Sequence, residues 1–107
     1  LMLQLGDLET MARERLPAVL VVFNNFRLGS QRKRVEAFGP VIGVDHGNPD
    51  FAKLAKLFEC RGFRVDTPGQ FAGALKEALA SGEPCIIDVI VDPEARPPRV
   101  QMSREAR

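Results

Sequence analysis

Continuous hydrophobic runs and helically spaced hydrophobic positions alternate along this chain. Residues 18–23 and 85–91 are apolar runs rich in β-branched side chains. Such runs are typical of strands that are covered on both faces in a parallel sheet. A shorter strand is expected at residues 63–65, where Arg64 interrupts the apolar sequence.

Three segments show the periodicity of helices with one buried face. The first covers residues 7–16, and Pro17 biases Leu16 away from helical geometry. The second begins with Asn48 as the predicted N-cap and Pro49 in the first helical position, with Gly62 just beyond its end. The third covers residues 67–81. The expected apolar stripes consist of Leu8, Met11, Ala12 and Leu16; of Phe51, Leu54, Ala55 and Phe58; and of Phe71, Ala74, Leu75, Ala78 and Leu79.

The third helix has clear end signals in the sequence. Thr67 and Gln70 have the spacing of a capping box, and Ser81-Gly82 closes the segment. Residues 26–47 lack a sustained period and predict a long functional or mobile loop, with a short helix around residues 31–37.

This order of elements predicts an α/β fold: a three-layer arrangement in which a parallel sheet is flanked by helices. The long apolar run at residues 85–91 favours the central position in the sheet, and residues 63–65 favour an edge. We expect one domain at residues 1–95 and a polar tail at residues 96–107.

Composition narrows the functional classes. The 107 residues are 45% hydrophobic with a formal net charge of +1, which argues against a dedicated nucleic-acid binder. No apolar run has the length of a membrane span and no signal-peptide pattern opens the chain, so a cytoplasmic protein is expected. Cys60 and Cys85 have no zinc-site spacing relative to His46 and are expected to be buried thiols.

The junction at Asn24-Asn25 is the most informative position for function. It ends the run at residues 18–23, and ligands of open α/β sheets bind beyond the carboxyl ends of strands. An asparagine carbonyl is a hard oxygen ligand suited to a magnesium ion that phosphates already hold. The alternative is that the two residues only turn the chain, because asparagine tolerates turn geometries.

A wider pattern around this junction resembles a known family. The matching segments are Leu8-Glu9-Thr10, Leu16-Pro17, Val21-Val22-Phe23-Asn24-Asn25, Asn48-Pro49-Asp50-Phe51-Ala52-Lys53-Leu54-Ala55, Gly62-Phe63-Arg64-Val65 and Ile87-Asp88-Val89-Ile90-Val91-Asp92-Pro93. In this order they resemble the C-terminal, diphosphate-binding domain of thiamine-diphosphate-dependent enzymes. Within that family the acetolactate-synthase-like group is the most similar, and Asn24-Asn25-Phe26 with the basic loop resembles sulfoacetaldehyde acetyltransferases.

The resemblance implies roles for particular residues. The side-chain oxygen of Asn25 and the backbone carbonyl of Arg27 would bind Mg²⁺, while Phe26 and Leu28 would lie near the diphosphate of thiamine diphosphate. The family motif opens with Gly-Asp-Gly, whose aspartate is expected just upstream of Leu1. Because Leu1 is not an initiator methionine, a truncated chain is expected.

The same resemblance implies a small-molecule 2-oxo acid or related substrate and a homo-oligomer. The glutamate that activates the cofactor would come from another domain, so no catalytic residue is assigned to this chain. We expect the isolated chain to be inactive and to bind the magnesium cofactor weakly. It would also expose the edge of residues 18–23 that a missing strand normally pairs, and this edge favours association.

Several alternatives remain open at this stage. His46 is either an ordinary loop residue or a substrate contact. The basic cluster of Arg27, Arg32, Lys33 and Arg34 is either solvated or recognises an anionic substrate or phosphate acceptor. The whole chain is either part of an enzyme or a non-catalytic α/β binding or interaction module. A Gly-Asp-Gly encoded just upstream of Leu1 would favour the enzyme, and a start codon there would favour the module.

Overall fold

Three parallel strands form the centre of the structure, a computed structural model that describes residues 1–95. Strand β1 (Val19–Asn24), strand β2 (Arg61–Val65) and strand β3 (Cys85–Ile90) lie in the order β1-β3-β2. The central position of β3 confirms the prediction from its long apolar run. Val22, Asp88 and Arg64 lie opposite one another in the register, so they form one row across the sheet.

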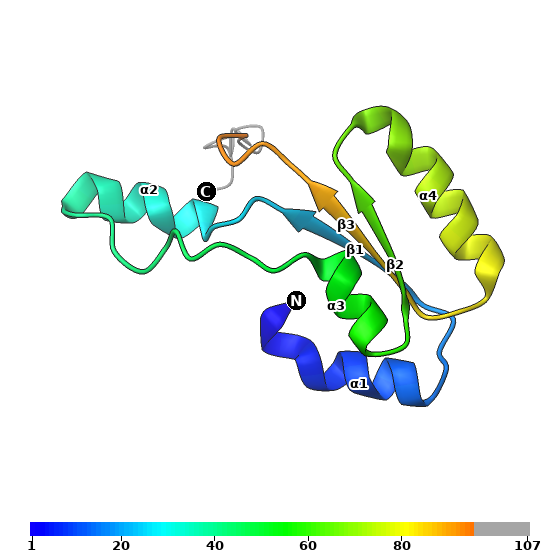
Figure 1. Ribbon diagram of the computed structural model, residues 1–107. Helices are drawn as coiled ribbons and strands as arrows, with labels where there is room; N and C mark the ends of the chain where they lie inside the picture. The colour runs from blue at the N-terminus through cyan, green and yellow to red at the C-terminus, as the bar shows by residue number, and fades with distance from the viewer. Residues whose placement is uncertain (96–107) are drawn as a thin grey trace, which may run out of the picture.

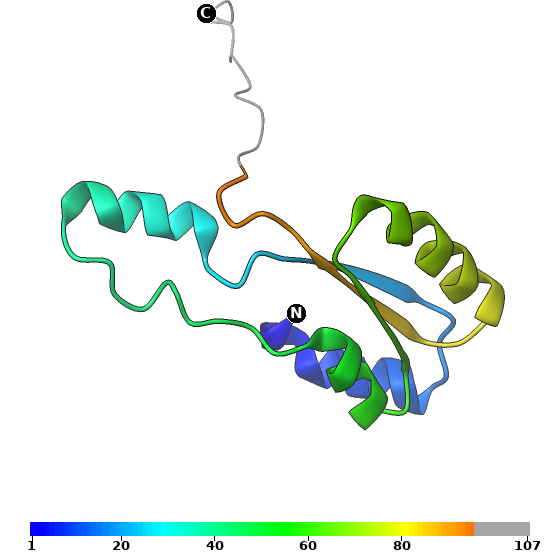
Figure 2. The same ribbon diagram turned by 45° about the horizontal axis from the view of Figure 1, so that its top comes forward.

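Helices cover both faces of the sheet, as the predicted three-layer α/β fold requires (Figure 1). A 3-10 turn (Met2–Gln4) leads into α1 (Leu5–Arg13), which lies with α3 (Phe51–Leu57) on one face. Helix α4 (Pro68–Ser81) packs on the other face. Helix α2 (Gly29–Phe38) projects away from the sheet in both views (Figures 1 and 2) and extends beyond the short helix that was predicted there.

Alternation along β3 divides the core into two clusters. Ile86 faces α1 and α3, whereas Cys85 and Ile87 face α4, and all three are fully buried. The buried members are Leu8, Met11, Phe51, Ala55, Cys60 and Ile86 in the first cluster, and Val65, Ala78, Cys85 and Ile87 in the second. The stripes predicted for the helices therefore face the core, with the exceptions of Leu16 and Leu79, which are 46% and 64% exposed.

Leu16 is exposed because α1 ends earlier than the sequence predicted. The backbone N–H of Leu16 donates to the Met11 carbonyl at 3.0 Å, and that of Arg15 donates to the Ala12 carbonyl at 3.1 Å. This pair of bonds forms a Schellman motif, in which Arg15 adopts the left-handed conformation with φ of 51°. The helix therefore stops at Arg13, and Leu16 no longer shares its buried face.

The predicted ends of the helix α3 are wrong at both termini. Asp50 is its N-cap, with a side chain that accepts from the Lys53 N–H at 3.0 Å, so Asn48 and Pro49 precede the helix. A second Schellman motif closes it at Glu59, which has φ of 58°, instead of at Gly62. Helix α4, by contrast, begins and ends as predicted: Gln70 accepts from the Thr67 N–H at 3.3 Å, and Gly82 caps the end with φ of 65°.

Gly62 has a different role, because it lies inside β2 where α3 crosses the strand. A Cβ atom at this position would lie 2.0 Å from the carbonyl oxygen of Ala52. The helix backbone therefore packs directly on the strand backbone, and only a residue without a side chain permits this approach.

Strand β1 is covered less completely than its apolar sequence suggested. Leu20 and Val22 pack against the cluster under α1 and α3, but Phe23 is 72% exposed on the opposite face. Within residues 1–95, β1 has β3 as its only strand partner, so its outer edge is open. A cavity of about 420 Å³ lies between α1 and this strand, lined by Leu8, Met11, Ala18 and Leu20 among others.

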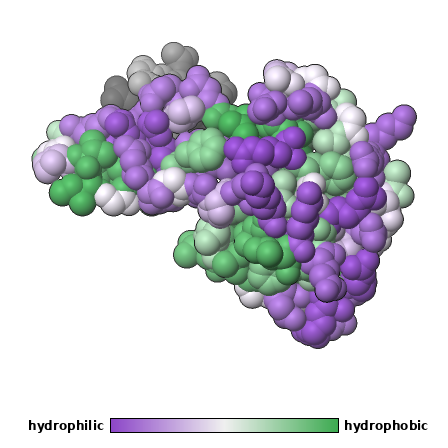
Figure 3. Space-filling view, viewed as in Figure 1, coloured by the Kyte–Doolittle hydropathy of each residue, from purple (hydrophilic) through white to green (hydrophobic). Residues whose placement is uncertain are grey.

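Two further hydrophobic regions lie on the surface. Met2 and Leu3 expose 48% and 98% of their surface, and Phe38 and Ile42 expose 91% and 75%. Hydrophobic side chains accordingly gather over the N-terminal segment and at the far end of α2 (Figure 3). No helix among the described residues has the length and hydropathy to cross a membrane. The polar tail predicted at residues 96–107 lies outside the described residues, and the domain boundary at residue 95 stays a prediction.

The contact at Gly62 gives a first testable prediction. We expect Gly62→Ala to lower the free energy of unfolding by about 3 kcal/mol or more, because overpacking typically costs 1–3 kcal/mol and backbone atoms cannot move aside cheaply. Gly73→Ala on α4 is the matched control, since a Cβ there meets nothing within 4 Å. It should stabilise the helix by about 0.5–1 kcal/mol. Urea unfolding measures both, and equal stability of the two variants would contradict the prediction.

Candidate functional site at the end of β1

Asn24, the last residue of β1, is fully buried and serves as a structural junction. Its Nδ2 donates to Asp88 Oδ1 at 3.0 Å. Its Oδ1 accepts from the Phe26 N–H at 3.2 Å and from Asn48 Nδ2 at 2.9 Å. Of the two asparagines that the sequence singled out, the first therefore belongs to the interior of the fold.

Asn25 lies in the turn that follows and is only partly buried. Its Oδ1 accepts from the Arg27 N–H at 3.3 Å, which makes an Asx turn. Phe26 takes a positive φ of 59°, which is unusual for a large residue, in the turn that follows the strand. The sequence-predicted residues Asn25, Phe26, Arg27 and Leu28 thus lie together in one turn at the carboxyl end of β1.

The turn is held from outside by the segment that leads to α3. The Gly47 N–H donates to the Phe26 carbonyl at 3.1 Å, and the Leu28 N–H donates to the Val44 carbonyl at 2.9 Å. The intervening carbonyl of Arg27 accepts no hydrogen bond from any residue in the 1–95 range. An oxygen that the fold positions but does not pair is available to a ligand.

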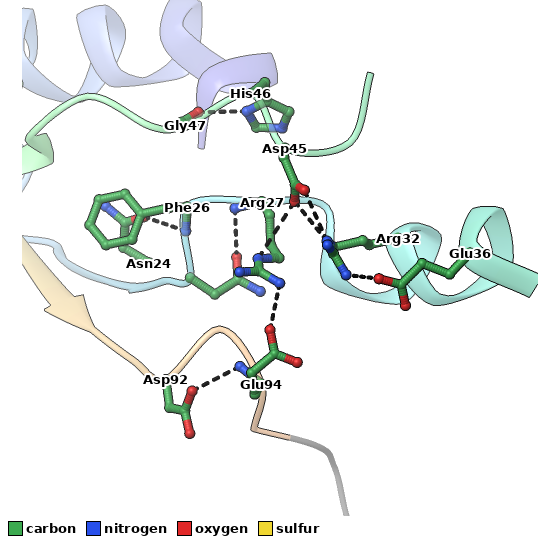
Figure 4. Close-up of polar contacts among 11 residues, drawn as sticks. Asn24, Phe26, Arg27, Arg32, Glu36, Asp45, His46, Gly47, Asp92 and Glu94 are labelled. Carbon is green, nitrogen blue, oxygen red and sulfur yellow. Dashed lines mark hydrogen bonds and ion pairs between the residues drawn. The ribbon is translucent and has the colours of Figure 1, made fainter. Parts of the chain in front are cut away.

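Ion pairs surround the Arg27 side chain (Figure 4). Its Nη1 lies 2.7 Å from Glu94, which follows β3, and its Nε lies 3.6 Å from Asp45. Arg32 on α2 also pairs with Asp45 at 2.9 Å and with Glu36. Two of the four residues in the basic cluster, for which the sequence left solvation and anion recognition open, are therefore paired with carboxylates, whereas Lys33 and Arg34 are exposed.

A cavity of about 540 Å³ opens beside this turn. Leu28 and His46 contribute to its wall, together with Val22 and Phe23 of β1 and the N-terminal segment. Asn25 and Phe26 do not line it. His46 is exposed and its Nδ1 contacts the Gly47 carbonyl, so it lies next to the turn without contacting Asn25.

The oxygen atoms at this turn fit a magnesium ion in their chemistry. Asn25 Oδ1 accepts a single hydrogen bond and retains a second lone pair, and the Arg27 carbonyl is a second neutral oxygen nearby in the chain. Within the described residues no three His, Cys, Asp or Glu side chains cluster in a way that could hold a metal. These two oxygens would thus supplement negatively charged ligands such as phosphate oxygens.

Asp50 contributes a fixed negative charge behind the site. Burial alone would raise the pKa of Asp50, but the hydrogen bond from the Lys53 N–H and the Arg64 guanidinium, 3.2 Å away, together hold it below its usual 3.8. Burial raises the pKa of the Cys60 thiol, in the core away from this turn. Cys60 and Cys85 are both buried and free, as the sequence predicted.

These features define an α/β domain with a candidate polar ligand site at the carboxyl end of an outer parallel strand, where such folds bind ligands. Comparison with known families gives the particular class. Residues 1–89 match the family described as "Thiamine pyrophosphate enzyme, C-terminal TPP binding domain". The chain belongs to this family.

Similarity to curated proteins points to the same group. The chain is 34% identical over 98 residues to a 2-hydroxyacyl-CoA lyase of Oryza sativa subsp. japonica, which covers 83% of this chain and 17% of that protein. It is 34% identical over 87 residues to an acetolactate synthase of Bacillus subtilis, and the match covers 80% of this chain and 15% of that protein. With an oxalyl-CoA decarboxylase of Escherichia coli the identity is 32% over 93 residues, and the match covers 83% of this chain and 16% of that protein. The chain thus spans about one sixth of the length of these relatives.

Sequence reasoning missed the residues that support the turn from behind. Asp88, Asn48 and Arg64 were assigned to a strand, a helix cap and an edge strand, although Asp88 and Asn48 hydrogen-bond to the buried Asn24 and Arg64 pairs with Asp88. One signal was present: Asp88 is the single charged residue within the apolar run at residues 85–91. A carboxylate in the middle of a central strand needs buried partners.

The charge of Asp50 makes the stability of the fold depend on pH. Because its pKa is lowered in the folded protein, its charge contributes stability that is present above the unfolded value near 3.8 and is lost as the pH falls through the folded value. Asp50→Asn keeps a good N-cap but removes the charge, whereas Asp50→Ala removes both and should cost about 1 kcal/mol at pH 7. Urea unfolding at pH 7 and in acid should show that wild type loses its advantage over Asp50→Asn in acid. An advantage independent of pH would contradict this account.

Proposed function

We propose that this chain holds the magnesium ion and the diphosphate of thiamine diphosphate in a 2-oxo acid decarboxylase or carboligase of the acetolactate-synthase-like group. The observation that carries the proposal is the turn after β1, where Asn25 Oδ1 and the unpaired Arg27 carbonyl lie within three residues of each other. Family membership over residues 1–89 supports the same cofactor.

Each residue of the turn has a proposed task. Asn25 Oδ1 and the Arg27 carbonyl would bind Mg²⁺, and both are neutral, so they add coordination without further charge. Phe26 and Leu28 would line the diphosphate. The Arg27 side chain points to Asp45 and Glu94, which keeps its positive charge occupied and anchors the backbone that carries the carbonyl (Figure 4).

The cofactor, when bound, would supply the electron sink for cleavage and formation of bonds next to a carbonyl. The chain itself would bind and orient it. We assign no catalytic residue here: Asp7 and Glu9 lie on α1 and are exposed. His46 remains a candidate substrate contact, since it lines the cavity beside Leu28.

The substrate and the assembly are proposals as well. We infer a small 2-oxo acid or related compound as the substrate, a homo-oligomer, and a cytoplasmic location that suits two buried free thiols. The finer similarity to sulfoacetaldehyde acetyltransferases rests on Asn24-Asn25-Phe26 and the basic loop. Because Arg27 and Arg32 are paired with carboxylates, anion recognition by this loop would fall to Lys33 and Arg34.

A non-catalytic binding or interaction module of the same fold is the alternative. The exposed apolar side chains Phe38 and Ile42 at the end of α2 favour it, since they offer a surface to another protein. The unpaired Arg27 carbonyl and the second lone pair of Asn25 Oδ1 favour the cofactor site, because an interaction module has no need of them.

The first functional prediction concerns Asn25 in the complete protein. Asn25→Ala should raise the Mg²⁺ concentration needed for half-maximal thiamine diphosphate binding at least tenfold, because one oxygen ligand is lost. Arg27→Ala retains its backbone carbonyl and should have a smaller effect. Calorimetric titration at several Mg²⁺ concentrations measures both, with Lys76→Ala on the exposed side of α4 as the control. An unchanged Mg²⁺ dependence in Asn25→Ala would contradict the proposal.

The second concerns the isolated chain of 107 residues. It should bind magnesium thiamine diphosphate weakly or not at all and should be inactive, because two neutral oxygens do not satisfy the nearly octahedral coordination of Mg²⁺. Calorimetry on this polypeptide is the measurement. Micromolar binding would mean that these residues suffice for the site.

A further inference from the structure

Asp88 is a fully buried carboxylate at the centre of the sheet, and the proposed roles of the turn residues leave it unexplained. It lies on β3, on the face covered by α3. Its Oδ1 accepts from Asn24 Nδ2 at 3.0 Å, and its Oδ2 accepts from the Phe51 N–H, the first of α3, at 3.1 Å. Arg64 on β2 lies 3.5 Å from Oδ2. One side chain therefore links all three strands and the start of a helix.

The hydrogen bonds of Asp88 determine which way the Asn24 amide points. A carboxylate only accepts, so it requires the Nδ2 group of Asn24 on its side. The Oδ1 of Asn24 must then face the opposite way, where it accepts from the Phe26 N–H at 3.2 Å and from Asn48 Nδ2 at 2.9 Å (Figure 4 shows the bond to Phe26). Every buried side-chain nitrogen and oxygen among the described residues has a hydrogen-bond partner, so no buried donor or acceptor of this network is left free.

The hydrogen bond from the Phe26 N–H to Asn24 Oδ1 connects this network to the turn that carries the proposed metal ligands. Phe26 has a φ of 59°, a conformation that a large residue adopts only when its surroundings hold it. The bond to Asn24 Oδ1 is one of its restraints, and the turn so formed carries Asn25 on one side and Arg27 on the other. Asp88 thereby influences both oxygens without contacting either.

We propose that Asp88 is a positioning residue for the cofactor site: by orienting Asn24, it holds the Phe26 turn in the conformation that presents Asn25 Oδ1 and the Arg27 carbonyl to magnesium. This inference rests on the proposed function of that turn. It adds a residue on the central strand, outside the turn itself, on which metal affinity depends.

The network makes a specific demand on substitutions. In Asp88→Asn, an amide replaces the carboxylate. If its oxygen faces Asn24, its NH2 group faces the Phe51 N–H, which is also a donor. If its NH2 group faces Asn24, the Asn24 amide must turn over, and the Asn24 NH2 group then faces the Phe26 N–H and Asn48 Nδ2. In Asn24→Asp, two carboxylates face each other in the interior. Combining the two restores the pattern in reverse, because the amide at position 88 can donate to the carboxylate at position 24 and still accept from Phe51.

The experiment compares these three variants in the complete protein. Thiamine diphosphate binding is titrated by calorimetry over a range of Mg²⁺ concentrations, together with thermal unfolding. Each single variant should need at least tenfold more Mg²⁺ for half-maximal binding, and the double variant should return to within about threefold of wild type. Ile87→Val is the matched control: it is buried on the same strand but faces α4. It should lower stability without changing the Mg²⁺ dependence.

Each outcome decides the inference. Single variants that fold and keep the wild-type Mg²⁺ dependence overturn it, and so does a double variant that fails to fold or that folds with the weakened affinity of the singles. If the single variants do not fold, a folded double variant with near wild-type Mg²⁺ dependence supports it. Asn25→Ala, titrated in parallel, distinguishes failure of the proposed function from failure of this inference. If Asn25→Ala has no effect on Mg²⁺ binding, the proposed function fails. If it weakens Mg²⁺ binding while the Asp88 variants do not, only this inference fails.

Discussion

The hydrogen bond between Asn24 Nδ2 and Asp88 Oδ1, buried between β1 and β3, is the interaction on which the rest of the structure depends. A carboxylate in a protein interior is costly unless each of its oxygens finds a donor, and breaking one such contact leaves an uncompensated charge. Here Asn24 on β1 and the Phe51 N–H at the start of α3 donate to the two oxygens, and the Arg64 guanidinium on β2 forms an ion pair with the carboxylate at 3.5 Å. The relative positions of these elements are therefore tied to a single side chain.

The same face of the sheet shows a second strict constraint, the contact of Gly62 with the Ala52 carbonyl. It brings α3 close to β2, which places the Phe51 N–H within reach of Asp88 and lets Asp50 pair with Arg64. The preceding segment then runs back beside the end of β1, where Gly47 and Val44 bond to the turn. Close backbone packing and the polar network thus support each other, and together they determine the course of the loop around the site.

At the site itself, the fold separates two neighbouring asparagines by environment. Asn24 points inward and uses its hydrogen-bonding capacity on the protein, whereas Asn25 keeps a lone pair for a ligand. The cost of the positive φ at Phe26 is offset by two hydrogen bonds: its N–H donates to Asn24 Oδ1, and its carbonyl accepts from the Gly47 N–H. Under the proposed function, these two adjacent residues of one type would serve different purposes, one structural and one in cofactor binding.

The sequence by itself determined the alternating elements, the central position of β3, and the turn in which Asn25 and Arg27 lie, because these follow from local periodicity and from the position of a strand end. It did not reveal where α1 and α3 stop, since both helices close through left-handed Arg15 and Glu59, residues that carry no such signal. Nor did it show that Gly62 serves a close contact or that Phe23 is exposed, because both depend on which element lies above the strand. The roles of Asp88, Asn48 and Arg64 were decided only by tertiary structure, since hydrogen bonds between residues 24 to 64 positions apart exist only after the strands have paired.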